Sequence, residues 1–122
     1  MQETKLWING QWESAQRTYE LTSPYSGEVI AKVAKANTED VTRAIEGAHE
    51  VFKSFKKTTA YERAEILYRV VDIMRGRKQE LAEILAHEAA KPISAGLVEL
   101  ERTIATYQFS AEAAKQSTGE TV

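Results

Sequence analysis

The first 35 residues alternate between apolar and polar positions, as short strands do. Lys5–Ile8 and Gln11–Ser14 flank the dipeptide Asn9-Gly10, which accepts the positive φ angles of a type I′ hairpin turn. Trp7 and Trp12 lie on the two arms, where they can stack across the hairpin. The sequence therefore predicts that the chain opens with an antiparallel hairpin.

Two further strands are predicted before residue 37. Arg17–Leu21 and Glu28–Lys35 show strand-like alternation, and Ser23–Gly27 between them carries the Pro and Gly of a turn. Beyond this point the chain becomes rich in Ala, Glu, Leu, Lys and Arg. This shift in composition predicts helices for the rest of the chain.

The first predicted helix is amphipathic and about five turns long. Asn37 or Thr38 is expected as its N-cap, because Glu39 and Asp40 follow where the helix dipole favours carboxylates. Its apolar residues recur at helical spacing and fall on one face. They are Val41, Ala44, Ile45, Ala48, Phe52 and Phe55.

Three more amphipathic helices are predicted after the first. Thr59–Glu62 matches a capping box that opens the second helix, and Gly76 is expected to break it. The third is predicted over Lys78–Ala90, before Pro92 stops it. The fourth is expected to be capped by Ser94 and closed by Gly119. Short strands followed by helices offer no central sheet, so the pattern is typical of part of a larger fold.

The amino-acid composition argues against several classes of function. The 122 residues suffice for one domain, and 16 Lys and Arg against 18 Asp and Glu give a net charge of -2. This balance argues against nucleic-acid binding and against polybasic membrane attachment. No apolar run is long enough for a signal peptide or a membrane span, and a cytoplasmic location is expected. The absence of cysteine excludes disulfides and a thiol nucleophile within these residues.

Motifs for metal binding and for phosphate binding are incomplete or absent. His87-Glu88 begins an HExxH pattern, but Lys91 stands where the second histidine ligand would be. No GxGxxG or GxxxxGK[ST] loop occurs in the sequence. The residues alone therefore predict a mixed α/β segment without catalytic or cofactor-binding residues.

The order of several short motifs resembles the opening of the aldehyde dehydrogenases. Ile8–Trp12 is similar to the INGxW pattern of that family, and Ser23–Ile30 to its NPxTGE turn and strand. Ser23, Ser26 and Ala90 depart from the usual Asn, Thr and Gly. Further matches, in family order, are Ala36–Phe52, Arg63 with Leu67, Glu80–Ala82, Glu88–Pro92 and Val98-Glu99.

The resemblance implies a Rossmann-like α/β fold. Residues 1–122 would form the N-terminal segment of its coenzyme-binding domain, with strands over about 5–35 and helices over about 38–118. It implies a parent enzyme that uses NAD or NADP to oxidise a small-molecule aldehyde to a carboxylic acid through a cysteine thiohemiacetal. The parent is expected to be a homo-oligomer, dimer or tetramer. The catalytic residues and most of the nucleotide-binding region lie outside this segment, which is predicted to be inactive alone.

The resemblance also implies one local site. Some family members bind a monovalent cation between the backbone near the turn that corresponds to Ser23–Gly27 and a carboxylate on the helix after Pro92. By position, the ligands here are the main chain of Thr22 and the side chain of Glu99. A simply solvated Glu99 is the alternative, and Glu101 replaces it if the alignment slips. Two broader questions stay open. The aldehyde could be lactaldehyde, glyceraldehyde 3-phosphate or succinate semialdehyde, and the chain could instead be a stand-alone helical protein-interaction module.

Overall fold

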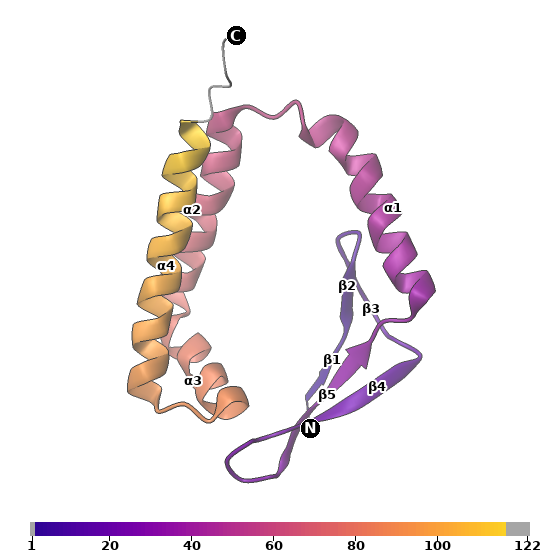
Figure 1. The fold of residues 1–122 in the computed structure, drawn as a ribbon, viewed down its shortest axis with the longest axis vertical. Coiled ribbons are helices and arrows are strands. Elements are labelled where there is room, and N and C mark those ends of the chain that lie inside the picture. Colours follow the sequence, from indigo (N-terminus) through magenta and orange to yellow (C-terminus); the bar gives the residue numbers. More distant parts are fainter. Residues whose placement is uncertain (1, 117–122) are drawn as a thin grey trace. The chain divides into compact units, whose positions relative to one another are not determined.

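The structure, a computed structural model, describes residues 2–116 (Figure 1). These residues divide into a strand-rich unit and a helical unit. The strand-rich unit comprises the chain up to Lys57 together with His87–Ala90. The helical unit comprises Thr58–Ala86 and the chain from Lys91 onward. Within the described residues, no helix is both long enough and apolar enough to cross a membrane.

Five strands form two small sheets in the strand-rich unit. β2 and β3 make an antiparallel hairpin, whereas the other three strands pair in the order β1-β5-β4. β4 runs antiparallel to β5, but β1 runs parallel to it. The bounds are β1 Gln2–Thr4, β2 Leu6–Ile8, β3 Gln11–Glu13, β4 Arg17–Thr22 and β5 Val29–Lys35.

β1 lies before the strands expected over about 5–35, and its parallel pairing with β5 was not predicted. This strand has three residues and pairs Glu3 with Lys32 and Thr4 with Val33. Its segment has no apolar alternation, so the sequence carried no signal for it. Backbone pairing with β5, nearly 30 residues away, defines the strand instead.

The predicted hairpin is confirmed in detail. Asn9 and Gly10 have φ angles of 51° and 80°, as a type I′ turn requires. Trp7 and Trp12 are paired across the strands, and their ring centroids lie 4.8 Å apart with planes tilted by 59°. Aromatic pairs prefer such tilted contacts, so the two rings stabilise the hairpin from one face.

The turn between β4 and β5 is also as predicted, with Ser23 as its organising residue. Its Oγ accepts hydrogen bonds from the backbone N–H groups of Tyr25 and Ser26, both at 3.3 Å. Gly27 takes a φ of 74° and donates to the Ser23 carbonyl at 2.9 Å. Ser23 thus performs locally the turn-closing role that Asn and Asp side chains commonly perform.

Capping residues set the first two helices. α1 spans Thr38–Phe55 with Asn37 as N-cap, and α2 spans Ala60–Gly76 with Thr59 as N-cap. Each N-cap forms a reciprocal capping box with the carboxylate three residues later. The predicted starts of both helices, and the end of α2 at Gly76, are confirmed.

The fourth helix begins earlier than predicted. α4 spans Ile93–Lys115, with Pro92 as an N-cap that makes no side-chain hydrogen bond, so the prediction of Ser94 as the cap is wrong. The Pro92 carbonyl accepts from Ala95 and Gly96 at 2.9 and 3.1 Å. Proline fits immediately before a helix because it has no N–H to satisfy, and Ser94 therefore lies inside the first turn. Gly119, the predicted end, lies outside the described residues.

The core of the helical unit lies between α2 and α4, which pack side by side (Figure 1). α3 spans Lys78–Ala89 and approaches α4 closely at Gly96, where a Cβ would lie 3.2 Å from the Ala82 carbonyl oxygen. The buried apolar residues of these helices are small or medium-sized. They are Ala64, Val71, Ala82, Leu100, Ile104 and Ala111.

Ala90 ends α3 in a conformation that favours glycine. The residue has a φ of 51°, one position beyond the last helical residue, Ala89. A left-handed residue commonly ends a helix, but a Cβ crowds the following carbonyl there. The third helix accordingly ends at Ala89, one residue before its predicted end.

We expect Ala90→Gly to stabilise the chain by about 1 kcal/mol, because glycine adopts the left-handed region without strain. The control is Ala89→Gly, which removes a helix-favouring residue next door and is expected to cost roughly 0.5 kcal/mol. Urea denaturation followed by far-UV circular dichroism measures both changes. Equal destabilisation by the two glycines would contradict the left-handed conformation of Ala90.

Candidate functional site

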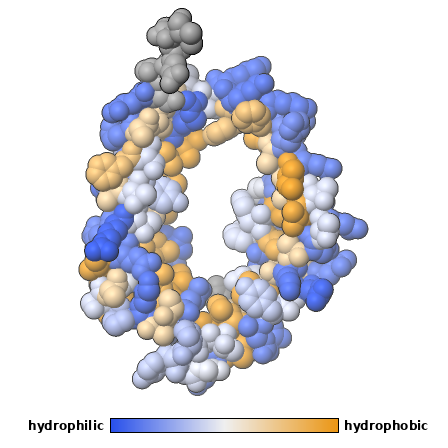
Figure 2. Space-filling view, in the orientation of Figure 1, coloured by the Kyte–Doolittle hydropathy of each residue, from blue (hydrophilic) through white to orange (hydrophobic). Residues whose placement is uncertain are grey.

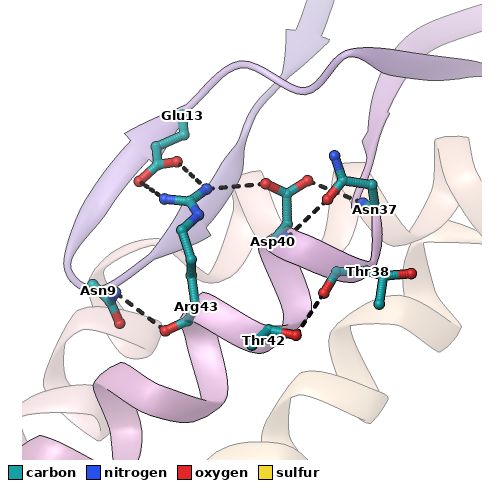
Figure 3. Close-up of polar contacts among 7 residues, drawn as sticks. All are labelled: Asn9, Glu13, Asn37, Thr38, Asp40, Thr42 and Arg43. Carbon is teal, nitrogen blue, oxygen red and sulfur yellow. Dashed lines mark hydrogen bonds and ion pairs between the residues drawn. The ribbon is translucent and has the colours of Figure 1, made fainter.

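A polar cluster joins the hairpin to α1 (Figure 3). The Arg43 guanidinium donates to both carboxylate oxygens of Glu13 on β3, at 3.2 and 2.7 Å. It also donates to Asp40 at 2.9 Å, and the other Asp40 oxygen accepts from the Asn37 backbone N–H at 3.0 Å. We call Glu13, Asn37, Asp40 and Arg43 the Arg43 cluster. Its bidentate geometry fixes the distance between β3 and the first turns of α1.

The pKa shifts within the Arg43 cluster indicate a structural role and not a role in acid–base catalysis. The hydrogen bonds from Arg43 lower the pKa of Glu13, and those from the Asn37 backbone and from Arg43 lower that of Asp40. The same contacts raise the pKa of Arg43 above its ordinary value, the Glu13 hydrogen bonds contributing most. All three groups therefore stay charged near neutral pH. None is poised to exchange a proton with a substrate.

Gly47 provides the space for the hairpin turn against α1. A Cβ at this position would lie 1.8 Å from the Asn9 side-chain oxygen, so no other residue fits without displacing Asn9. The Asn9 amide group also donates to the Arg43 carbonyl at 3.4 Å. In the sequence, Gly47 stands apart from any glycine-rich motif and by itself carries little functional weight. An isolated glycine inside a helical pattern was the available signal for this close approach.

The two predicted cation ligands lie in different units of the chain. Thr22 is the last residue of β4, next to an irregularity in the pairing with β5, and its side chain is exposed. The Glu99 carboxylate on α4 accepts a hydrogen bond from the Lys91 ammonium. Glu101, the alternative ligand, pairs with Lys78, and this contact lowers the pKa of the Glu101 carboxyl.

An open groove of about 550 Å³ runs along the first turns of α4. It combines a hydroxyl, two small apolar groups, a carboxylate and a guanidinium, from Ser94, Ala95, Val98, Glu99 and Arg102. No described residue adds a cysteine or a histidine to this lining. The groove can contact a ligand, but its lining lacks a nucleophile paired with a base.

Neither histidine belongs to a group of metal-ligating side chains within the described residues. His49 on α1 and His87 on α3 are both exposed. No group of three His, Asp or Glu side chains in residues 2–116 is placed to hold a metal ion. His87-Glu88 is therefore part of an ordinary helix end in the described structure.

Comparison with known proteins identifies the family. The sequence profile of the aldehyde dehydrogenase family matches residues 12–122. The chain belongs to the aldehyde dehydrogenase family. The resemblance read from the sequence motifs is thereby confirmed, and so is the α/β fold.

Individual relatives show how much of an aldehyde dehydrogenase the chain spans. It is 37% identical over 117 residues to the 3-sulfolactaldehyde dehydrogenase of Priestia aryabhattai, covering 96% of this chain and 24% of the relative. It is 34% identical to the D-glyceraldehyde dehydrogenase (NADP(+)) of Thermoplasma acidophilum, covering 98% of this chain and 25% of the relative.

A solved structure gives the same proportion. The salicylaldehyde dehydrogenase of Pseudomonas putida G7, complexed with salicylaldehyde, matches with a TM-score of 0.93 and 30% identity. The match covers 100% of this chain and 26% of that protein. The chain thus spans about a quarter of the length of its relatives and corresponds to their N-terminal part.

Arg43→Met is expected to destabilise the chain and to flatten its response to acid. The lowered pKa values of Glu13 and Asp40 mean that their contribution is present above their unfolded-state pKa values, near 4, and is lost as the pH falls through the folded-state values. Urea midpoints measured between about pH 3 and 7 should therefore fall less steeply in the variant than in the wild type.

Arg69→Met is the matched control for Arg43→Met. Arg69 is exposed on α2 and forms no ion pair within the described part of the chain. Its replacement should leave both the midpoint and its pH dependence unchanged. Identical behaviour of the two variants would show that the Arg43 cluster contributes nothing to stability.

Proposed function

We propose that this chain is the N-terminal part of an NAD(P)-dependent aldehyde dehydrogenase, which oxidises an aldehyde to a carboxylic acid. The family match over residues 12–122, at a quarter of the length of the relatives, carries the proposal. In this reading the chain supplies scaffold for the coenzyme-binding domain. The reacting groups come from other parts of the enzyme.

The residues of this chain support a scaffolding role, with the reacting groups supplied by other parts of the enzyme. Oxidation through a covalent intermediate needs a nucleophile that also leaves readily, and a cysteine thiolate satisfies both conditions. The 122 residues contain no cysteine. Glu13 and Asp40, the carboxylates of the Arg43 cluster, are held ionised by Arg43. A nicotinamide coenzyme, bound by other parts of the enzyme, would supply the hydride acceptor, and this chain would supply scaffold for the domain that binds it.

The names of two relatives support a proposal for the substrate class. One is named for 3-sulfolactaldehyde and another for D-glyceraldehyde, both of which are small hydroxylated aldehydes. A small hydroxylated or phosphorylated aldehyde is accordingly the proposed substrate of the parent enzyme, with NAD or NADP as coenzyme. A cytoplasmic homo-oligomer without nucleic-acid or membrane partners is the proposed context, in keeping with a net charge of -2.

The test compares the 122-residue chain with the product of the complete reading frame. The frame is first sequenced past the codon for Val122, where a cysteine in a glycine-rich setting is expected. The complete product should reduce NAD or NADP in the presence of glyceraldehyde or lactaldehyde, whereas the 122 residues alone should show no turnover. Coenzyme reduction by the pure short chain would contradict the proposed division of labour.

A stand-alone interaction module is the second candidate, favoured by the exposed apolar residues of α1. It requires a stop codon directly after Val122. It also requires a monodisperse chain with a cooperative melt, because a module must fold without a covalent partner. Both results together would replace the enzyme proposal with the module.

A monovalent cation held by Thr22 and Glu99 is a further proposal for the parent enzyme. Hard oxygen ligands suit such an ion, but the cation must compete with Lys91 for the Glu99 carboxylate. Exchanging potassium for choline at constant ionic strength should lower the Tm of the wild-type enzyme and leave that of Glu99→Gln unchanged. If Glu101→Gln alone abolishes the cation effect, Glu101 is the ligand; if neither does, the site is absent.

A further inference from the structure

The hairpin turn places an asparagine directly before a glycine at the surface of the chain. Asn9 and Gly10 are both exposed. The backbone N–H of Gly10 donates no hydrogen bond within the described residues, and a Cβ at Gly10 would meet nothing within 4 Å. The Gly10 nitrogen is therefore unhindered, and the side-chain amide carbon of the preceding residue is an electrophile within its reach.

Few contacts hold the Asn9 side chain in its position. Its amide group donates to the Arg43 carbonyl, but the distance of 3.4 Å is longer than is usual for such a bond. Its oxygen lies against Gly47, which has no side chain to enclose it. The helix that it contacts, α1, carries hydrophilic as well as apolar residues at its surface (Figure 2), so water can replace the amide group there. The side chain can therefore leave the helix and turn its Cγ toward the Gly10 nitrogen.

We propose that Asn9 is a site of spontaneous intramolecular deamidation. The Gly10 nitrogen attacks the Asn9 Cγ, so that a new N–C bond forms and the bond from Cγ to Nδ2 breaks. The proton of the Gly10 nitrogen passes through water to the departing nitrogen, which leaves as ammonia. The resulting succinimide ring takes up one water molecule and opens at either of its two carbonyl carbons. Residue 9 thereby becomes aspartate or isoaspartate, and the reaction needs no oxidant, reductant or enzyme.

The other asparagine of the chain lies in a less reactive setting. Asn37 is followed by Thr38, whose β-branched side chain crowds the backbone nitrogen that would attack. The Asn37 side-chain oxygen also accepts from the Asp40 backbone N–H at 2.9 Å, as the N-cap of α1. Asn37 therefore serves as an internal control for Asn9 in the same molecule.

Either product weakens the contact between the hairpin turn and α1. Aspartate has no N–H to donate to the Arg43 carbonyl, and its charged oxygen atoms repel that carbonyl oxygen. Isoaspartate lengthens the main chain by one carbon atom, which a two-residue type I′ turn does not accommodate. The cross-strand pairing of Trp7 with Trp12 is then disturbed as well. Deamidation therefore releases the hairpin turn from the helix.

The reaction is tested by ageing the product of the complete reading frame at body temperature and mildly alkaline pH. Trypsin releases residues 6–17 and 36–43 as separate peptides, each of which holds one asparagine. Mass spectrometry should show that residue 9 loses its amide at least about tenfold faster than residue 37, and that it yields both aspartate and isoaspartate. Gly10→Ala should suppress the reaction, because a Cβ hinders the attacking nitrogen. The comparison with residue 37 needs no variant, so it holds even if alanine at a φ of 80° disturbs the turn.

The structural consequence is tested with Asn9→Asp, which supplies the aspartate product as a uniform sample. Its matched control is Gln11→Glu, which makes the same amide-to-acid change on β3. Gln11 is exposed, and its side chain makes no hydrogen bond within the described residues. Hydrogen–deuterium exchange over the hairpin and the first turns of α1 should be faster in Asn9→Asp than in the wild type, and unchanged in Gln11→Glu.

Three results would overturn the proposal. Equal survival of the two amides during ageing shows that the fold protects Asn9. Aspartate without isoaspartate shows direct hydrolysis by water and no attack by Gly10. Equal exchange in Asn9→Asp and Gln11→Glu shows that the contact with α1 does not depend on the amide. None of these measurements uses coenzyme reduction, so the proposed function is tested separately.

Discussion

The contact between the hairpin turn and α1 organises the strand-rich unit. It depends on a steric fit, because Gly47 leaves room for the Asn9 side chain, and on a charge pairing, because Arg43 binds Glu13 across the two elements. A side chain at residue 47 would require the Asn9 side chain to move away from the helix. The type I′ turn is equally required, since its positive φ angles present Asn9 to the helix.

Apolar burial is unevenly distributed along the chain. The helical unit places Ala64 and Ala111 at full burial, and such small residues let α2 and α4 approach closely. The strand-rich unit buries Ile8 but leaves exposed the two tryptophans of the hairpin, together with Ile45 and Phe52 of α1. Its order comes mainly from backbone pairing, caps and the Arg43 cluster. Hydrogen bonds and ion pairs therefore hold this unit together, whereas hydrophobic packing holds the helical unit together.

Sequence reasoning succeeded where local chemistry decides the structure. Asn9-Gly10 defines its turn, Thr59 and Glu62 cap each other, and neither outcome depends on distant residues. It failed where a distant strand or a neighbouring proline determines whether an element forms or where it begins. β1 exists because β5 pairs with it, and α4 starts before Ser94 because Pro92 supplies the first carbonyl. For the candidate site, family motifs indicated the enzyme class, but the role of Gly47 required the three-dimensional contact.

The short sequence separations within the strand-rich unit have a consequence for biosynthesis. Arg43 lies 30 residues from Glu13, and Asn9 lies 34 residues from the Arg43 carbonyl it contacts. Contacts of this range form faster than those between distant segments, and N-terminal regions leave the ribosome first. The hairpin and α1 can therefore assemble while later residues are still being translated. During that interval the nascent chain displays an ordered, water-exposed apolar helix face, which is the kind of surface that molecular chaperones bind.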